Sequence, residues 1–194
     1  MGHGKYIAPP PGQYRVNAGE RLDLQFVVLP GESRDIDVSV DLAGPGASVQ
    51  IKALYLCGAD ERVRFRILVH HLAPDCKSSQ CIKGLAGGSA RVNFDGTIVV
   101  APDAQHTEAM QENHNIVLTP EARVDASPRL EIYADDVKCS HGATVGRLSA
   151  DERFYMRSRG IPDAEARILQ MLSFLSPVIP DGRTEEIESA LRKL

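Results

Sequence analysis

The chain has 194 residues, enough to bury a sizeable core, and its four cysteines are too few and too irregularly spaced for a secreted disulfide framework. Its 22 basic and 26 acidic residues are interleaved and give a net charge of -4, which argues against nucleic acid or an anionic membrane surface as partners. With no tryptophan and 5% aromatic residues, the chain also lacks the composition of a base-stacking platform.

The N-terminal segment, residues 1–19, contains the run Pro9-Pro10-Pro11 and no apolar core followed by a cleavage site. This composition argues against a secretory signal and predicts a flexible lead-in. Elsewhere no stretch approaches the roughly 18 consecutive apolar residues that a membrane-spanning helix needs. We therefore expect a soluble, cytoplasmic protein whose thiols are reduced.

Residues 20–146 have the pattern of successive β-strands. The clearest alternation of apolar and polar residues runs from Asp35 to Leu42, where every second side chain is apolar. Further strands are predicted at 49–56, 63–67, 90–98, 116–118, 122–124, 130–133 and 137–139. Glycine and proline punctuate this region, with predicted turns at Pro30-Gly31, Gly44-Pro45-Gly46, Gly58, Pro74-Asp75, Gly87-Gly88, Pro102-Asp103, Pro120 and Pro128.

Two architectures fit so many short strands, an antiparallel sandwich or barrel and a solenoid of β-coils. A strict repeat length would select the solenoid, but the turn signals fall at irregular intervals and no hexapeptide pattern persists. The missing hexapeptide also makes a β-solenoid acyltransferase the least favoured function. Periodicity alone therefore predicts only a mostly β protein.

Residues 147–194 change to a helical period. Ser149-Ala150-Asp151-Glu152 is a capping box, and Gly160 is a left-handed stop, so we predict a helix over 150–159. A second helix is predicted from about 162–163, ending at Pro177 or Pro180, and a third after Thr184. Because this unit is too small to fold alone, we expect it to dock on the β part or on a partner.

The segment Asp135–Gly146 contains the main candidate ligands. On a strand, Cys139 and His141 point to the same face, and thiolate and imidazole both bind iron. Two ligands do not close a metal site, so another strand or a partner chain is needed to complete it. The alternative is that Cys139 is a small buried hydrophobic residue and His141 a hydrogen-bonded histidine at a turn.

Three other polar groups invite a functional interpretation. Cys76 and Cys81 would point to opposite faces of a strand, so we interpret them as surface or turn cysteines, with sulfur acceptance from a desulfurase as the alternative. His70 and His71 would also point apart, one buried and one at the surface. The polar run Thr107–Asn113, flanked by His106 and His114, could form side-chain ladders between strands.

No phosphate-binding loop, nucleophile elbow or dinucleotide fingerprint occurs, so nucleotide binding is assigned to a partner. On the first predicted helix, Tyr155 and Arg159 are four residues apart and share a face. The two interpretations of this pair are partner docking and a solvated arginine beside a packed tyrosine.

Asp135–Gly146 and Phe154–Ile161 together resemble the SufB/SufD family of cytosolic iron–sulfur cluster scaffolds, and the SufD branch is the more similar. The resemblance implies a right-handed parallel β-helix followed by a small helical subdomain, in a protein that is not an enzyme. It implies pairing through the β-helix, with a SufB-like partner or as a homodimer, and docking of a SufC-like ABC-type ATPase on the helices, where Tyr155 and Arg159 lie. A cysteine desulfurase system is a further implied partner.

In SufD-like members, the residues matching Cys139 and His141 lie at the pairing interface, and the histidine is a suspected ligand of a transient iron–sulfur cluster. This chain departs from SufB-type members, because it has Ala122 in place of a cluster-ligating cysteine and lacks an acidic-His-acidic pattern at Cys139-Ser140-His141-Gly142. It therefore carries half of the proposed ligand set. The alternative function is a metal-free interaction module that dimerises and recruits a partner.

Overall fold

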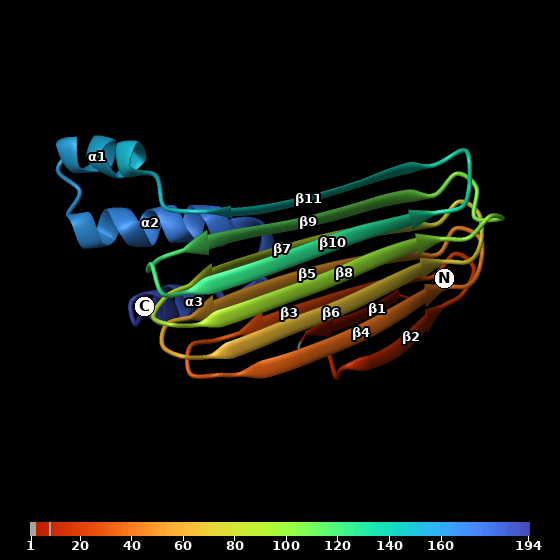
Figure 1. Ribbon diagram of the computed structural model, residues 1–194, viewed down its shortest axis with the longest axis horizontal. Coiled ribbons are helices and arrows are strands. Elements are labelled where there is room, and N and C mark those ends of the chain that lie inside the picture. The colour runs from red at the N-terminus through yellow and green to blue at the C-terminus, as the bar shows by residue number, and fades with distance from the viewer. Residues whose placement is uncertain (1–2, 8) are drawn as a thin grey trace.

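A computed structural model describes residues 3–7 and 9–194. The described chain forms a β part followed by helices at one end of it (Figure 1). The strands are β1 (His3–Ile7), β2 (Gly12–Val16), β3 (Arg21–Val28), β4 (Arg34–Leu42), β5 (Ser48–Cys57), β6 (Arg62–His71), β7 (Lys77–Ala86), β8 (Arg91–Val100), β9 (Glu108–Val117), β10 (Arg123–Ile132) and β11 (Lys138–Gly146). The helices are α1 (Ala150–Ser158), α2 (Asp163–Leu175), the short 3-10 helix η1 (Ser176–Val178) and α3 (Thr184–Leu191).

Successive strands alternate between two sheets. The odd-numbered strands form one sheet in the order β1-β3-β5-β7-β9-β11, and the even-numbered strands form the other in the order β10-β8-β6-β4-β2. Every neighbouring pair is parallel, for example β5 with β7 and β6 with β8. Each coil therefore adds one strand to each sheet, and the predicted parallel β-helix is confirmed.

The coils differ slightly in length. In the larger sheet Ser48 lies beside Lys77, Lys77 beside Glu108 and Glu108 beside Lys138, which are steps of 29, 31 and 30 residues. The chain is therefore a true repeat whose period drifts through the lengths of its turns. That drift is why the sequence shows no strict repeat.

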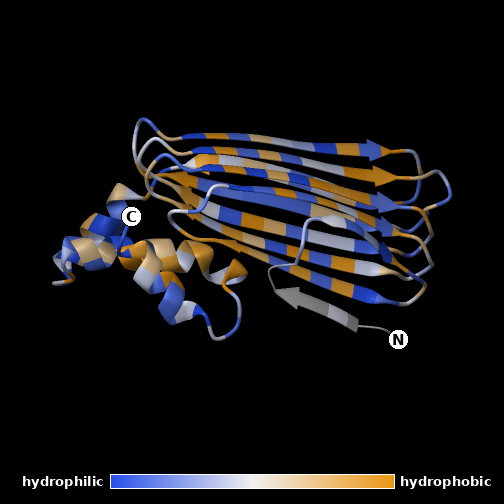
Figure 2. Cartoon of the chain, turned by 90° about the horizontal axis from the view of Figure 1, so that it is seen from below, coloured by the Kyte–Doolittle hydropathy of each residue, from blue (hydrophilic) through white to orange (hydrophobic). Residues whose placement is uncertain are grey.

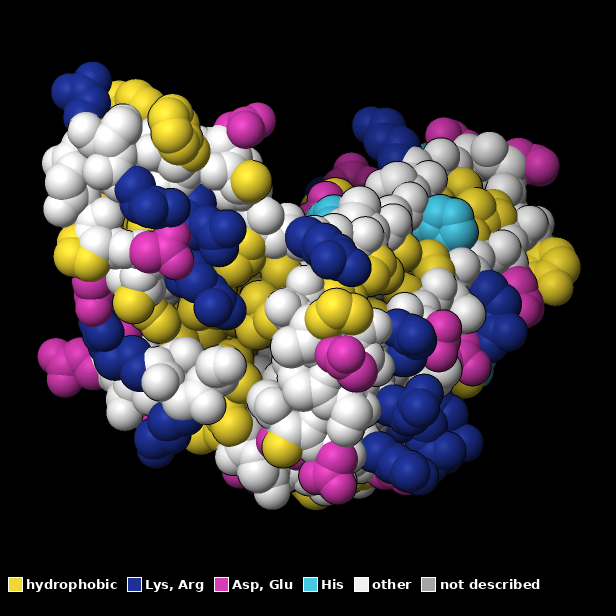
Figure 3. Space-filling model, turned by 60° about the vertical axis from the view of Figure 1, so that its left-hand side comes forward, with side chains coloured by type: hydrophobic (Ala, Val, Ile, Leu, Met, Phe, Trp, Pro, Cys, Tyr) yellow, Lys and Arg dark blue, Asp and Glu magenta, His cyan; other side chains and the backbone are white. Residues whose placement is uncertain are grey.

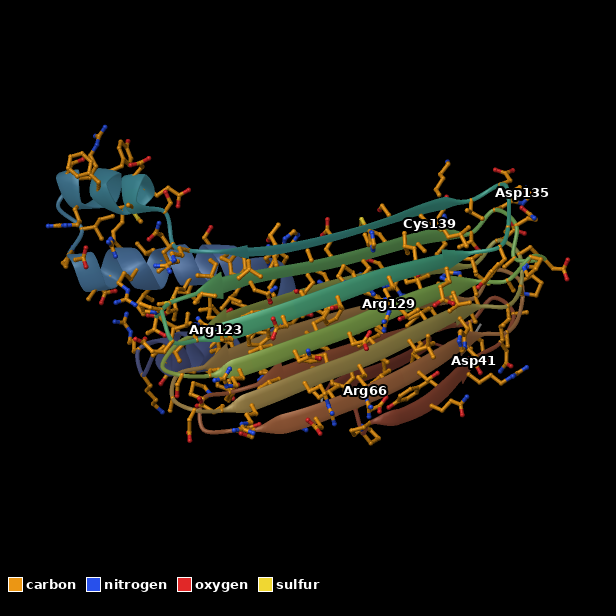
Figure 4. All side chains as sticks on the ribbon, viewed as in Figure 1. Asp41, Arg66, Arg123, Arg129, Asp135 and Cys139 are labelled. Carbon is orange, nitrogen blue, oxygen red and sulfur yellow. The ribbon has the colours of Figure 1, made fainter. Side chains whose placement is uncertain are left out.

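The space between the two sheets is the core. Inward residues alternate with outward ones along each strand, and Figure 2 shows the resulting bands of hydrophobic and hydrophilic residues. In the smaller sheet Val63, Phe65 and Ile67 of β6 lie beside Val92, Phe94 and Gly96 of β8. The outward residues carry charges in matching pairs, such as Arg66 with Asp37 and Arg129 with Asp95 (Figure 4).

Strand β7 was not predicted, because its inward residues include Ser78, Gln80 and Gly84 and so lack the usual apolar alternation. Gly84 is required by packing, since a Cβ there would come within 2.2 Å of the Tyr55 ring. Pro128 was predicted in a turn but lies inside β10, an edge strand, where the missing N–H can face away from the ladder.

The predicted flexible lead-in over residues 1–19 differs from the structure, which places β1 and β2 there. Strand β2 pairs with β4 from Gly12–Val38 to Val16–Leu42, and Val16 is buried. The parallel ladder offers the polar N-terminal strands backbone partners that the local sequence does not reveal.

The helices cover the outer face of the larger sheet at the end where its strands finish. Val27, Leu54, Leu56, Leu85 and Ile116 of the sheet form one apolar cluster with Ile168, Met171, Leu175, Ile187 and Leu191 of α2 and α3. The predicted docking of the helical unit on the β part is confirmed. None of the helices in the described residues is both long and apolar enough to cross a bilayer.

Candidate functional site

The coil that ends the β part leaves two strands unpaired on one side. Strand β11 pairs only with β9, and β10 only with β8, so both are edge strands of the described chain (Figure 1). The backbone N–H and C=O groups along such edges are available to another chain. The predicted ligands lie on β11, at this open end of the solenoid.

Cys139 and His141 both point toward the inner side of the coil. Cys139 lies beside the buried Ala109 of β9, and His141 beside the buried Gln111. Thr144 has the opposite parity on β11 and points outward, where its hydroxyl lies 2.9 Å from Nδ1 of His114. Cys139 and His141 therefore point inward. The predicted shared face is correct, and His141 is exposed because no described strand pairs with the other side of β11.

Cys139 is half-buried on β11 (Figure 4) and packs with Ala109, Leu130 and Val137. Burial raises the pKa of its thiol, and a backbone hydrogen bond from Ala109 opposes that rise. The thiol is therefore protonated at neutral pH in the isolated chain and would have to lose its proton to become a metal ligand.

The donor set is chemically suited to iron but incomplete. Thiolate and imidazole are both established ligand types for iron–sulfur clusters. In the described part of the chain, no three or more His, Cys, Asp or Glu residues gather into a metal-binding group. Cys139 and His141 therefore form at most half of a site, and the open edge is where the other half could approach.

The other histidines do not form a metal site with each other. His71 is fully buried, with Nε2 2.8 Å from Ser78 Oγ, whereas His70 is half-buried with Nδ1 2.9 Å from Asp41 Oδ1. The predicted division into one buried and one surface histidine is confirmed. His106 bridges the corners of adjacent coils through Asp75 and Asp136.

Cys76 and Cys81 lie on opposite sides of the sheet, as their spacing predicts. Cys76 directly follows the turn at Pro74-Asp75, which agrees with the expected turn position, but it is fully buried and not at the surface, and its S–H donates to the carbonyl of Gly44. Cys81 is half-buried and packs against the apolar cluster beneath the helices. Burial raises the pKa of both thiols, so neither is activated as a nucleophile, and sulfur acceptance stays a prediction.

Polar ladders cross the inside of the larger sheet, as the run Thr107–Asn113 predicts. Gln111 Nε2 donates to Gln80 Oε1 at 3.0 Å, and Tyr55 donates through its hydroxyl to Asn115 Oδ1 at 2.6 Å. Gln80 was missed in the sequence because it lies inside the Cys76–Cys81 segment. The signal was its spacing of 31 residues from Gln111, one coil length.

Helix α1 carries a second candidate surface. It has no buried side chain, and Phe154 and Tyr155 are 73% and 59% exposed. The guanidinium carbon of Arg159 lies 5.3 Å from the centre of the Tyr155 ring, a cation–π arrangement. The sequence placed these two side chains on one face, and the structure confirms that they touch.

A groove between α1 and α2 adjoins this pair. It is lined by apolar and polar side chains, namely Tyr155, Met156, Leu169, Gln170 and Ser173, together with Asp151 and Glu152. Leu169 is 47% exposed, and hydrophobic side chains are visible on the helical part in Figure 3. Phe154 of α1 was missed as a surface residue, although the lack of an apolar stripe along α1 was a signal. Leu169 was missed because it lies within the apolar run of α2.

The described residues thus form a two-sheet parallel β-solenoid that is open at its last coil, where the half-buried thiol of Cys139 and the exposed imidazole of His141 share one face of β11. The family model described as "SUF system FeS cluster assembly, SufBD core domain" matches residues 13–174. The chain therefore belongs to the SufBD family.

Similar curated proteins carry related names. The chain is 34% identical over 173 residues to an iron–sulfur cluster assembly SufBD family protein of Mycobacterium leprae, covering 85% of this chain and 44% of that protein. It is 36% identical over 152 residues to the iron–sulfur cluster assembly protein SufD of Escherichia coli, covering 78% and 36%. For SufD of Bacillus subtilis the identity is 30% over 153 residues, covering 79% and 35%. The chain thus spans less than half the length of these relatives.

Proposed function

We propose that this chain is a SufD-like, non-enzymatic scaffold component of iron–sulfur cluster assembly. The observation that carries the proposal is the position of Cys139 and His141, which point inward from the edge strand β11. The cluster is cargo in this proposal, held transiently and released to other proteins. Membership of the SufBD family and the names of the relatives support the same role.

Because Cys139 and His141 are an incomplete ligand set, the proposal requires a second chain. Two donors leave most coordination positions of a cluster open, so a partner must supply further ligands. Strands β10 and β11 offer unpaired backbone edges beside these donors, and parallel or antiparallel pairing there would bring a partner's side chains to His141. A SufB-like chain or a second copy of this chain would fill that position.

The exposed face of α1 supports docking of a SufC-like ABC-type ATPase. Phe154, Tyr155 and Leu169 form an apolar surface beside a groove, and Arg159 stacks on Tyr155 at its margin. Aromatic and arginine side chains are the residues that most often dominate interface energies. Nucleotide binding and hydrolysis would belong to the ATPase, which moves the scaffold.

Anaerobic reconstitution with iron and sulfide tests the cluster role. The chain is mixed with a SufB-like partner or kept alone, and cluster absorption is recorded for the wild type, His141→Ala and Cys139→Ser. The matched control is His114→Ala, because His114 lies on the outer face of the neighbouring strand. We expect the cluster to be lost in His141→Ala and retained in His114→Ala.

A metal-free interaction module is the second candidate function. It is favoured by the packing of Cys139 against Ala109 and by the absence of a larger ligand group in the described residues. Reconstitution distinguishes the two functions, since a module without metal would give no cluster with either partner while still dimerising. Equal cluster yields in His141→Ala and the wild type would exclude His141 as a ligand.

Calorimetry with a SufC-like ATPase tests the docking surface separately. We expect Arg159→Ala to weaken binding about fivefold, or about 1 kcal/mol, the loss of an arginine contact to the partner, without lowering the melting temperature. Arg66→Ala is the control, because Arg66 and its partner Asp37 both lie on the smaller sheet, which the helices do not cover. Unchanged affinity in Arg159→Ala would remove this residue from the interface.

A further inference from the structure

A column of inward side chains in the larger sheet leads from the core to His141. The parallel register places Leu24 beside Ile51, Ile51 beside Gln80, Gln80 beside Gln111 and Gln111 beside His141. The first four side chains are buried, and only His141 is exposed. Gln111 is therefore the buried residue directly beneath His141 in the preceding coil.

The two glutamines form an amide ladder with a direction. Gln111 Nε2 donates to Gln80 Oε1 at 3.0 Å, so the nitrogen side of the Gln111 amide faces β7. The amide is planar, with its oxygen on the opposite side from its nitrogen, so Oε1 faces β11. In the described chain this buried oxygen has no hydrogen-bond partner. A buried carbonyl oxygen without a donor is unfavourable.

Packing holds the Gln111 amide in this orientation. The nitrogen lies against Gly96 of the opposite sheet, where an added Cβ would approach it to within 2.5 Å. The Gln111 side chain therefore reaches across the interior to the opposite sheet, and the hydrogen bond to Gln80 fixes its nitrogen. Rotation of the Gln111 amide alone would break its hydrogen bond to Gln80.

Register sets Gln111 apart from the other unsatisfied amides of the larger sheet. Asn113 Nδ2 and Gln80 Nε2 also lack partners in the described chain. Asn113 lies beside Ala143 of β11, and Gln80 lies beside Ile51 of β5, and neither of these side chains offers a polar group. Only Gln111 Oε1 faces a side chain that can donate, the imidazole of His141. The match is therefore specific to this column.

We propose that Gln111 is the positioning residue for His141. When the exposed His141 ring turns toward it, Gln111 Oε1, which has no hydrogen-bond partner in the described chain, accepts a hydrogen bond from one ring nitrogen. That bond fixes the ring orientation and the tautomer and leaves the lone pair of the other nitrogen directed to the open edge. Metal-ligating histidines commonly have their second nitrogen held in this way by an oxygen acceptor. The ligand role of His141 rests on the proposed function, whereas the proposed hydrogen bond between Gln111 and His141 does not.

The test begins with the metal-free, reduced full chain labelled with ¹⁵N-histidine. At pH 8, long-range ¹⁵N–¹H correlation spectra report the tautomer of each neutral imidazole, and the signal missing in His141→Ala assigns His141. We expect one tautomer of His141 to predominate in the wild type and a mixture in Gln111→Met, which has no acceptor. The matched control is Asn113→Leu, in which the His141 tautomer should not change.

A second variant keeps the test decisive if Gln111→Met does not fold. Gln111→Asn retains the amide but is one methylene shorter, so its oxygen falls short of His141 while the lumen stays polar. An unchanged His141 tautomer in a folded Gln111→Met or Gln111→Asn chain would overturn the proposal. A change in either, with none in Asn113→Leu, supports it.

Iron binding separates this inference from the proposed function. With a SufB-like partner present, we expect Gln111→Met to weaken Fe²⁺ binding roughly tenfold, the usual effect of losing an outer partner of a ligating histidine. If the wild type binds no iron while the tautomer still depends on Gln111, the proposed function fails and the positioning contact stands. If iron binds but the tautomer is independent of Gln111, the positioning proposal is the one that fails.

Discussion

His71 should make the fold sensitive to mild acid. Its ring is fully buried between Ser78 and Thr107, with Nε2 2.8 Å from Ser78 Oγ and Nδ1 3.5 Å from Thr107 Oγ1. Burial lowers the pKa of this imidazole from 6.5 to about 4. The protonated ring would place a charge between two hydroxyls in an otherwise neutral interior, which is why the folded state resists protonation.

The sign and size of the effect follow from the two pKa values. Between pH 6.5 and about 4 the unfolded chain binds a proton at His71 and the folded chain does not, so the stability present above pH 6.5 is lost as the pH falls through this window. The full loss is about 3 kcal/mol, because each pKa unit corresponds to about 1.4 kcal/mol. From pH 7.5 to pH 5, we expect His71 to remove about 2 kcal/mol from the free energy of unfolding.

Urea unfolding at several pH values, in the wild type and in His71→Gln, measures this contribution. The variant keeps a polar, neutral side chain, so its stability should fall about 2 kcal/mol less than that of the wild type between pH 7.5 and 5. Glu61 does not interfere, since hydrogen bonds from the backbone of Gly31 and Ala59 outweigh its burial and lower its pKa in the wild type and in His71→Gln alike. Parallel pH profiles for the wild type and His71→Gln would refute the reasoning, and His114→Gln serves as the surface control.

Two further predictions concern packing and thiol reactivity. Gly84→Ala should lower the free energy of unfolding by about 1–3 kcal/mol in urea titrations, because the new methyl group meets the Tyr55 ring, and an unchanged midpoint would show that the ring can move aside. Cys57, whose pKa burial raises to about 12, and Cys76 should react with iodoacetamide at pH 7.5 at least tenfold more slowly in the folded chain than in urea. Rapid alkylation of folded Cys76 would instead support its role as a sulfur acceptor.

The helical part could be predicted from the sequence because its signals are local. The serine half of the predicted capping box is present, with Ser149 Oγ accepting from the Glu152 N–H at 3.2 Å, whereas the Glu152 carboxylate accepts from Gln170 Nε2 of α2. Gly160 follows the helix with a positive φ of 88°. Both features depend on residues within one or two helical turns. The predicted range of 150–159 accordingly agrees with α1 to within one residue.

The β part could be predicted only strand by strand, because its pairing is between residues about 30 positions apart. The shared face of Cys139 and His141 followed from strand parity, which needs no knowledge of the partners. Gln80 and Gly84 could not be recognised as inward residues, since their reasons for being there are Gln111 and Tyr55 in neighbouring coils. The inward residues of the β part that sequence reasoning missed are therefore those whose packing partners lie in the neighbouring coil.

The composition of the interior changes toward the open end of the larger sheet. Inward positions are apolar in β3, mixed in β7 and mostly polar in β9, whereas the smaller sheet stays apolar as far as Leu130 of β10. Three of the buried polar atoms without partners in the described chain, Gln80 Nε2, Gln111 Oε1 and Asn113 Nδ2, lie in β7 and β9. A self-contained solenoid would gain stability from apolar residues at these positions, because unsatisfied buried amides oppose folding. Of the three, only Gln111 lies beside a residue of β11 that can donate, His141, so the proposed positioning role accounts for the Gln111 amide and not for those of Gln80 and Asn113.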